Sequence, residues 1–276
     1  MEEWRLLPFQ RMNCFENMAV DEALLRAYRY EQRPPTVRFY SWLRSSVTVG
    51  YFQNLGEEVD AHFCREHKID IVRRPTGGKA VFHDRDLTYS IVADESSSLF
   101  SPDIIETYRM IGTCLLRGFE KLGIDARMVG EGRHTEDAIL HSYCFSVPVQ
   151  HELLVEGKKI CGSAQMRAKG VFLQHGSILL NFDPRMACKV MNGQGQDMEA
   201  TIRGLKQSVT SVRDHSCVSV SEDALCCAMR EGFEERMNVR FAEGTLSQRE
   251  YRMKESLLRE KYMNDRWNRE GKVSLG

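Results

Sequence analysis

The chain is predicted to fold as an α+β protein with a mixed, largely antiparallel sheet flanked by helices. Short apolar and β-branched runs separated by turn residues occupy 37–92 and 153–181, as expected for strands joined by hairpins. Segments with helical spacing of apolar residues, 13–30 and 101–122, stand beside these groups. Strands that connect mainly by short turns, with helices in between, imply an α+β fold.

The N-terminal part is predicted to form one helix followed by five strands. Asn13 and Glu16 suit the start of the helix, and apolar residues recur at helical spacing after them. The pair Pro34-Pro35 ends this unit, because proline cannot continue a helix. The expected strands are 37–42, 46–52, 70–74, 79–83 and 87–92.

The middle of the chain is predicted to form a second helix and a group of strands. Ser101 suits the N-cap of the helix, Pro102 its first position, and Gly123 its end. A polar loop is expected at 131–141, and a tight turn at Glu156-Gly157. The expected strands are 125–130, 142–147, 153–155, 159–166 and 171–181.

The last third of the chain is predicted to be mainly helical. Residues 183–191 form a short helix, and a linker rich in Gly and Gln follows at 192–197. The expected division is a catalytic domain, residues 1–192, and a small helical extension, residues 193–276, packed on it.

Two capping boxes are expected within this extension. Ser219 precedes Glu222 by three residues, and Ser247 precedes Glu250 by the same interval. In such a box each side chain bonds the other residue's backbone N–H, which favours a helix start. Each pair therefore predicts the beginning of a helix.

Composition is that of an ordinary soluble globular protein and excludes several classes of function. The net charge of −1 provides no overall field for nucleic acid or a membrane surface, and no apolar run has the length of a membrane span. The N-terminus lacks the basic and apolar regions of a secretory signal. No heptad repeat demands assembly. We therefore expect a cytoplasmic monomer that binds neither nucleic acid nor membrane.

The nine cysteines follow no disulfide or metal-binding pattern. Their number is odd, and no Cys-x-x-Cys occurs. A reducing compartment is the simplest interpretation, in which most of these thiols are small apolar packing residues. No metal is expected.

The strongest local signal is the segment Arg73-Arg74-Pro75-Thr76-Gly77-Gly78-Lys79-Ala80-Val81-Phe82-His83-Asp84. Adjacent glycines let the backbone approach a ligand closely, because no Cβ intervenes. The two arginines can bind carboxylate or phosphate oxygens through paired hydrogen bonds. By itself the segment predicts an anion-binding turn.

Two further segments follow it in order, Gly157-Lys158-Lys159-Ile160-Cys161-Gly162-Ser163-Ala164-Gln165 and Leu173-Gln174-His175-Gly176-Ser177. The three segments together resemble the lipoate–protein ligase and octanoyltransferase family, which is related to the biotin–protein ligases. The likeness extends over about residues 4–182, and several motifs in order are more specific than any single one. It implies the biotin/lipoyl protein ligase-like catalytic fold.

One branch of the family, similar to the octanoyltransferases of Gram-positive bacteria, carries Cys-Phe shortly before a Glu-Leu-x-Val-x-Gly-x-Lys strand. Here Cys144-Phe145 precedes Glu152-Leu153-Leu154-Val155-Glu156-Gly157-Lys158-Lys159. The C-terminal pairs Lys261-Tyr262 and Trp267-Asn268 also resemble this branch. A buried packing cysteine is the ordinary interpretation of Cys144. The resemblance implies a nucleophile instead, because a cysteine thiolate attacks thioesters readily.

Lys159 resembles the lysine that contacts the acyl carbonyl in relatives. Strand alternation predicts that its side chain shares one face with three other polar side chains, Cys161, Ser163 and Gln165. An ordinary solvent-facing strand would show the same pattern. With the resemblance we favour a polar cleft, in which Lys159 accepts the thiol proton of Cys144 and donates toward the carbonyl.

The resemblance also places His175 in the wall of the acyl pocket and gives His83 a similar position. A catalytic role for either histidine stays open. Candidates for the apolar lining are Val49, Val81 and Leu179. The residues expected to contact substrate are Arg73, Arg74, Gly77, Gly78, His83, Gly162, Ser163 and His175.

The implied reaction moves an octanoyl group from octanoyl–acyl carrier protein to one lysine of a lipoyl-domain protein. The expected acceptor is the H protein of the glycine cleavage system. The acyl group passes through a thioester on Cys144. Because conversion of a thioester to an amide is downhill, neither ATP nor a metal is expected.

Three alternatives stay open. An amidotransferase would take the acyl group from another lipoyl domain by the same cysteine chemistry. An ATP-dependent lipoate ligase would bind an acyl-adenylate with Arg73, Arg74 and Lys159, and would not need Cys144. An inactive module that only binds lipoyl domains would need neither Cys144 nor Lys159.

Overall fold

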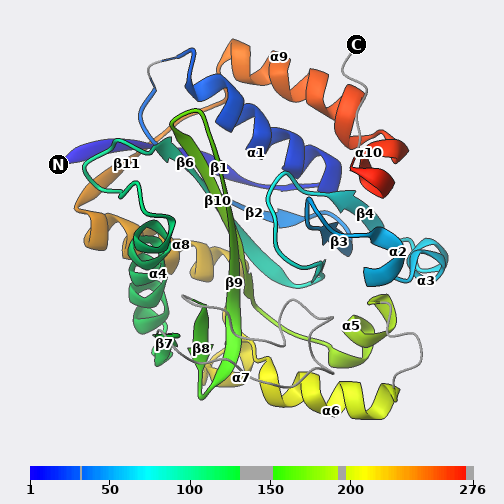
Figure 1. The fold of residues 1–276 in the computed structure, drawn as a ribbon. Coiled ribbons are helices and arrows are strands. Elements are labelled where there is room, and N and C mark those ends of the chain that lie inside the picture. The colour runs from blue at the N-terminus through cyan, green and yellow to red at the C-terminus, as the bar shows by residue number, and fades with distance from the viewer. Residues whose placement is uncertain (32, 131–151, 192–196, 272–276) are drawn as a thin grey trace.

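A computed structural model of the chain describes residues 1–31, 33–130, 152–191 and 197–271. Two sheets form its framework, an eight-stranded sheet and a three-stranded sheet, and helices cover both faces of the larger one (Figure 1). The strands are β1 (Glu2–Met12), β2 (Thr36–Trp42), β3 (Ser46–Val49), β4 (Asp70–Arg73), β5 (Val81–His83), β6 (Asp86–Asp94), β7 (Ala126–Met128), β8 (Leu153–Val155), β9 (Lys158–Ala168), β10 (Val171–Leu179) and β11 (Val239–Glu243).

Among the described residues, helices occur before Leu122 and after Asp183, and most of them lie in the last third of the chain. They are α1 (Cys14–Tyr28), α2 (Leu55–Glu58), α3 (Ala61–Glu66), α4 (Ile104–Lys121), α5 (Pro184–Val190), α6 (Met198–Ser208), α7 (Val212–His215), α8 (Glu222–Met237), α9 (Gln248–Leu257), the π-helix η2 (Leu258–Tyr262) and α10 (Asp265–Glu270). In the described parts of the chain, none of them combines the length and apolar character that a bilayer span requires.

The strand order of the large sheet is β11-β1-β2-β6-β10-β9-β8-β7, and that of the small sheet is β4-β3-β5. Strand β1 is parallel to both β2 and β11, whereas every other pairing in the large sheet is antiparallel. In the small sheet β3 is parallel to β4 and antiparallel to β5. The predicted fold class, a mixed and largely antiparallel sheet flanked by helices, is confirmed.

The two faces of the large sheet have different partners. On one side, here called the α4 face, α4 and α8 cover an aromatic core that includes Phe39, Tyr89, Phe119 and Phe233. On the other side, here called the α1 face, α1 packs on the sheet through apolar residues such as Val20. Helix α9 covers the outer side of α1 (Figure 1). Burial of these apolar surfaces is the main stabilising contribution to the fold.

Of the five helix starts predicted from local signals, three are confirmed and two are imprecise, and helices α2, α3, α6, α7 and α10 were not predicted. Asn13 caps α1, since its side chain accepts a hydrogen bond from the Glu16 backbone N–H at 2.9 Å. Helix α4 starts two residues later than predicted, with Asp103 as its N-cap. The reason is a local turn, in which the Ser101 hydroxyl accepts from the Asp103 N–H at 3.1 Å.

The two predicted capping boxes have different outcomes. Ser247 and Glu250 form the expected box, with hydrogen bonds of 2.7 Å and 3.1 Å. Helix α8 starts instead after Ser221, so the predicted box at Ser219 is wrong. The Glu222 carboxylate of that pair bonds Arg11 on β1 at 2.7 Å rather than a backbone N–H.

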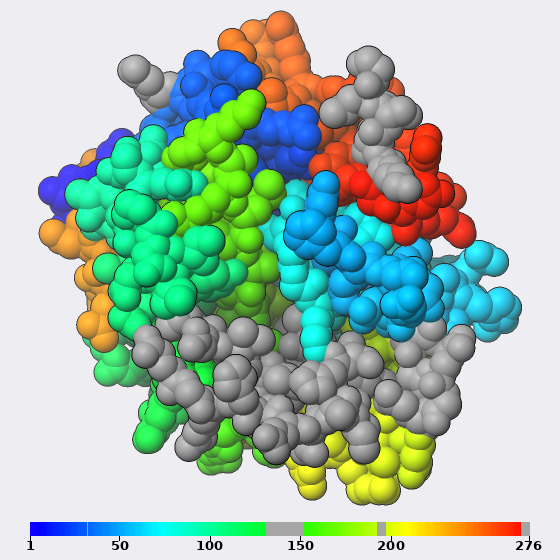
Figure 2. Space-filling model, viewed as in Figure 1, coloured from blue at the N-terminus to red at the C-terminus, as the bar shows by residue number. Residues whose placement is uncertain are grey.

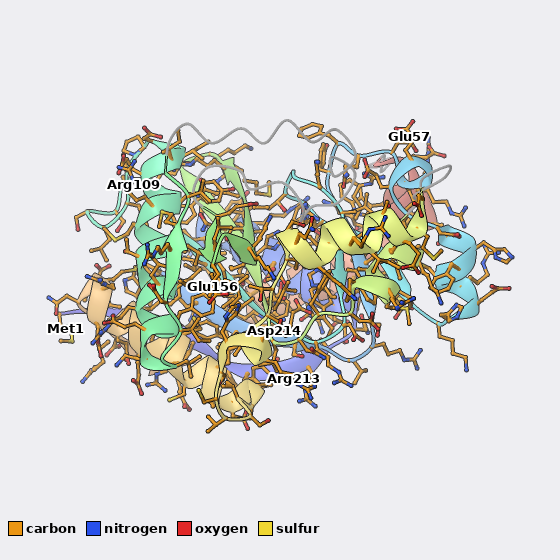
Figure 3. All side chains as sticks on the ribbon, turned by 90° about the horizontal axis from the view of Figure 1, so that it is seen from below. Met1, Glu57, Arg109, Glu156, Arg213 and Asp214 are labelled. Carbon is orange, nitrogen blue, oxygen red and sulfur yellow. The ribbon has the colours of Figure 1, made fainter. Side chains whose placement is uncertain are left out.

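The sequence patterns missed both strands at one edge of the large sheet. In β1 the pairing register with β2 shifts between Leu7 and Gln10, around Pro8, because proline has no N–H for the ladder. Strand β11 comes from the predicted helical extension and pairs with β1 from Glu2 to Leu6. The extension therefore contributes to the main sheet, and the predicted division at residue 192 stays a prediction. Met1, at this edge, and Glu57 of α2 lie at opposite ends of the molecule (Figure 3).

Candidate functional site

A narrow pocket opens on the α1 face, between the large sheet and the small sheet. Six of the ten predicted site residues line it. Its mouth lies at the turn that contains Gly78, which is exposed, whereas its inner residues are nearly fully buried. Figure 2 shows this turn, in cyan, at the surface beside the light-green strands β9 and β10. The lining residues are Met18, Tyr40, Trp42, Thr48, Arg74, Gly78, Val81, His83, Thr88, Gly162, Ser163, Ala164, His175, Gly176 and Ser177.

The pairing register explains which side chains face the pocket. His175 lies opposite Ala164 of β9, and Ser177 lies opposite Gly162. Directly paired residues point to the same face of a sheet. The smallest residues of β9, Gly162 and Ala164, therefore face the pocket and leave it open.

The prediction that four polar side chains of β9 share one face is wrong, because those of Cys161, Ser163 and Gln165 point away from Lys159, although Ser163 still contributes to the pocket lining. Cys161 lies in the core of the α4 face, where burial raises the pKa of its thiol to about 12 although the charge of Lys159 opposes this. The Ser163 hydroxyl lies 2.6 Å from the Tyr89 hydroxyl. Gln165 donates to the side chain of Gln174 at 2.8 Å.

Lys159 separates from these residues through a β-bulge. Leu153 pairs with Cys161 whereas the next residue, Leu154, pairs with Lys159, so Ile160 is an extra residue in β9. Because Leu153 and Leu154 point to opposite faces, Cys161 and Lys159 do as well. The bulge thus turns Lys159 toward the α1 face, the face that carries the pocket.

Lys159 is fully buried and forms an ion pair with Glu152. It lies three residues from Gly162 along β9, about 10 Å at the rise of a strand. Its side chain is not among those that line the pocket. The candidate nucleophile Cys144 lies outside the described residues, and Glu152 is the first described residue after it.

Arg73 does not line the pocket, although it was predicted to bind substrate. Its guanidinium is buried and donates to the carbonyl oxygens of Gly50, Tyr51 and Gln53 at 2.8–3.1 Å. It also donates to carbonyls of α10, including that of Trp267 at 3.1 Å. All five N–H groups of Arg73 thus have carbonyl acceptors, and Arg73 fastens α10 to the loop at 50–53.

Arg74 and Gly78 do line the pocket, whereas Gly77 does not. Arg74 is buried and donates to the carbonyl oxygens of Thr48, Gly77 and Lys79 at 2.7–3.1 Å. Gly78 has a φ of +86°, which favours glycine. Its carbonyl oxygen would lie 1.8 Å from a Cβ on Gly50. The turn therefore depends on the absence of a side chain at both positions.

His175 belongs to a buried network at the inner wall. Its Nδ1 lies 3.2 Å from Oδ2 of Asp21. The same oxygen accepts from the Tyr40 hydroxyl at 2.8 Å, and Oδ1 of Asp21 accepts from Arg38 at 2.8 Å. Because the carboxylate can only accept, Nδ1 carries the proton, and Nε2 accepts from the Thr76 hydroxyl at 2.6 Å. Both ring nitrogens are thus occupied.

Burial and neighbouring groups shift the pKa values of both Asp21 and His175 in this network. Burial by itself would raise the pKa of Asp21, but the Arg38 guanidinium and the His175 hydrogen bond hold that pKa below its usual value. Burial lowers the pKa of His175, and the Asp21 hydrogen bond opposes this. The network accordingly contains an ionised Asp21 beside a neutral His175 at neutral pH.

His83 has a parallel arrangement on the opposite wall. Its Nδ1 donates to Asp86 at 2.8 Å, and its Nε2 lies 3.0 Å from the Thr48 hydroxyl. Its ring stacks on Trp42 with 3.9 Å between centroids. The Trp42 Nε1–H donates to Thr88 at 3.0 Å. Both ring nitrogens of His83 and the Trp42 N–H are thus bound to protein, so this wall presents ring surfaces to the pocket.

The sequence patterns missed the residues that hold these two histidines, Asp21, Asp86, Thr48 and Thr76. One signal was present for Asp21, a carboxylate among the small apolar residues of a helix that has to be buried. Asp86 follows His83 by three residues. Of the predicted apolar lining, Val81 contributes to the pocket, whereas Val49 and Leu179 belong to a core cluster beside it.

Comparison with known proteins identifies the family. Residues 13–234 match the family model described as the lipoyl protein ligase A/B catalytic domain. The chain belongs to this family. The match passes residue 192, so this lipoyl protein ligase A/B domain extends into the predicted helical extension.

Individual relatives agree with the family model over nearly the whole chain. The curated octanoyltransferase LipM of Kyrpidia tusciae is 40% identical over 272 residues, which cover 97% of this chain and 99% of the relative. A bipartite lipoate protein ligase from Thermoplasma acidophilum has a similar structure, with a TM-score of 0.81, 30% identity and coverage of 97% and 96%. A lipoate-protein ligase A bound with ATP reaches 0.79, with 31% identity and coverage of 97% and 98%. The predicted likeness to ligases and octanoyltransferases is confirmed.

Proposed function

We propose that this chain transfers an octanoyl group to a lysine of a lipoyl-domain protein. The observation that carries the proposal is the full-length similarity to a curated octanoyltransferase. The pocket supports it, because a narrow cavity whose polar side chains are bound to one another suits an alkyl chain. The buried ammonium of Lys159 on the pocket face suits the carbonyl at the end of that chain.

The donor in this proposal is octanoyl–acyl carrier protein. The carbonyl carbon of its thioester forms a bond to the Cys144 sulfur, and its bond to the carrier thiol breaks. The carrier thiol leaves with the proton that Cys144 gave up. The acceptor lysine amine then attacks the new thioester, an amide bond forms, and the Cys144 thiol recovers a proton.

Lys159 has two tasks in this scheme. It first gives one ammonium proton to Glu152, then accepts the thiol proton of Cys144 as an amine, and the ammonium so formed donates toward the carbonyl oxygen as charge develops there. Glu152 orients the ammonium through the ion pair. The Gly77-Gly78 turn and Gly162 allow the backbone and the acyl group to approach each other.

The remaining expectations belong to the same proposal. The acceptor is the H protein of the glycine cleavage system, and the enzyme is a cytoplasmic monomer. Neither ATP nor a metal takes part, because the thioester supplies the free energy. In the described ranges, no group of three or more His, Cys, Asp or Glu side chains is arranged as metal ligands would be.

ATP-dependent lipoate ligation is the second candidate function. The similarity to a lipoate-protein ligase A bound with ATP favours it. In that case the acyl group would be activated as an adenylate, and Cys144 would be dispensable.

Intact-protein mass spectrometry distinguishes the two functions. The protein is mixed with octanoyl–acyl carrier protein without ATP, and apo H protein is added afterwards. The transferase predicts an octanoyl adduct on the wild type, its transfer to the H protein, and no adduct on Cys144→Ala. Cys161→Ala is the matched control, since that thiol is buried in the α4-face core. An acceptor modified only with ATP and free acid, and equally by Cys144→Ala, would establish the ligase.

If octanoyl–acyl carrier protein gives no adduct but an octanoylated lipoyl domain does, the donor differs from the proposed one. The enzyme would then be an amidotransferase.

A further inference from the structure

Three of the large side chains that line the pocket, from α1 and β2, are nearly fully buried. Met18 of α1 is 1% exposed, Tyr40 of β2 is fully buried, and Trp42 is 6% exposed. The residues at the mouth, such as Gly78 and Val81, are more exposed. An alkyl chain that enters at the mouth and extends toward α1 would meet Met18, Tyr40 and Trp42.

Two of these three side chains are immobilised by polar contacts. The Tyr40 hydroxyl donates to Asp21 at 2.8 Å, and the Trp42 indole donates to Thr88 while it stacks on His83. Such anchored aromatic side chains cannot move away without breaking buried hydrogen bonds. They form a rigid part of the end wall.

Met18 is the adjustable part of this wall. Its thioether is unbranched and adapts its shape to neighbouring groups. Behind it lies an apolar cluster that includes Cys14 and Val72. Removing the end of the Met18 side chain would therefore lengthen the pocket into apolar space.

We propose that Met18 sets the length of acyl chain that the pocket accepts. This inference rests on the proposed function, because it treats the pocket as the acyl site. The anchored pair of Tyr40 and Trp42 fixes the width of the inner end, and the Met18 side chain fixes its depth. Octanoyl is then favoured because longer chains meet the Met18 thioether.

The test measures binding of hexanoate, octanoate, decanoate and dodecanoate by calorimetry, together with transfer of the matching acyl groups from acyl carrier protein. In the wild type, affinity should stop rising after octanoate. Met18→Ala should move this limit to decanoate or beyond, with a relative kcat/KM for decanoyl over octanoyl about tenfold higher. Met18→Phe should move the limit down to hexanoate. The matched control is Met253→Ala, a methionine that packs on the same apolar cluster but does not line this pocket.

The inference is supported if the chain-length limit rises in Met18→Ala and falls in Met18→Phe. If Met18→Ala does not fold, the change of this limit in Met18→Phe decides alone. If both variants keep the chain-length limit of the wild type, the inference is overturned. Failure of the proposed function is recognised separately. In that case no acyl group is transferred by the wild type, while the binding limits still move with the residue at position 18.

Discussion

Lys159 reaches the pocket face because β9 contains one extra residue, Ile160. Its ammonium is buried beside Glu152, where it can act on a carbonyl in surroundings that water does not screen. We expect Lys159→Met to reduce octanoyl transfer by about 100-fold or more, because the donor to the developing oxyanion is lost. Single-turnover kinetics with octanoyl–acyl carrier protein provide the measurement.

The neighbouring Lys158 is the control for this experiment, since it lies outside the bulge and is only half-buried. Lys158→Met should retain nearly full activity. Similar losses in both variants would mean that Lys159 acts only through the stability of the strand.

His175 predicts a pH dependence of stability. Burial lowers its pKa below the ordinary value of 6.5, so the unfolded chain binds this proton at a higher pH than the folded chain does. Stability should therefore fall as the pH drops below about 6.5, and level off once the folded-state pKa is passed. In His175→Gln this part of the dependence should disappear. Urea unfolding between about pH 5 and 7.5 measures it, and an unchanged slope in the variant would contradict the assignment.

At the scale of elements, the turn at the pocket mouth depends on contact between two backbone segments. A Cβ on Gly50 would lie 1.8 Å from the carbonyl oxygen of Gly78. Gly50→Ala should displace the turn, reduce transfer by at least about tenfold and cost about 1–3 kcal/mol in stability. Kinetics and urea unfolding of the same preparation provide both numbers.

Gly56→Ala is a matched substitution nearby, because its Cβ would meet no neighbouring atom closer than 3.8 Å. This variant should keep its activity. If both alanine variants behave alike, contact between Gly50 and Gly78 is not what shapes the mouth.

At the scale of the whole molecule, a buried ion pair joins β1 to α9, and its two residues lie 245 positions apart in the sequence. Arg5 bonds both carboxylate oxygens of Glu250, at 2.9 Å and 2.5 Å, and both side chains are more than nine-tenths buried. Glu250→Gln should destabilise the fold by about 3 kcal/mol, because Arg5 would keep a buried charge without its counter-ion. Chemical denaturation measures this difference.

The double variant Arg5→Met, Glu250→Leu should recover most of the lost stability, since it removes both buried charges together. A double variant as unstable as Glu250→Gln would show that the two side chains act independently of their pairing.

The C-terminal residues connect to the site through a second set of buried contacts. Arg73 bonds carbonyls of α10, and the Trp267 indole donates to the Arg73 carbonyl at 3.0 Å. Lys261 bonds Glu22 of α1 at 2.7 Å, next to the buried Asp21. The last third of the chain thus holds α1 and the loop at 50–53, which are the elements around the pocket.

The sequence by itself determined the fold class, the family and the segments that surround the pocket. Strand alternation, capping residues and paired glycines are local properties, and they locate elements such as α1 and the turn at Glu156-Gly157. The order of three motifs was specific enough to indicate the family. It also indicated Arg74, Gly78, His83 and His175, which line the pocket.

Only the tertiary structure decided which way several side chains face. Alternation assigned Lys159 and Cys161 to one face, but the bulge, whose register depends on the partner strand β8, separates them. The sequence patterns do not distinguish Arg73 from the adjacent Arg74. In the structure Arg73 anchors α10 and Arg74 lines the pocket, because their neighbours come from distant parts of the chain. Spacing along a chain records local geometry, whereas a side chain's role depends on the contacts that folding brings to it.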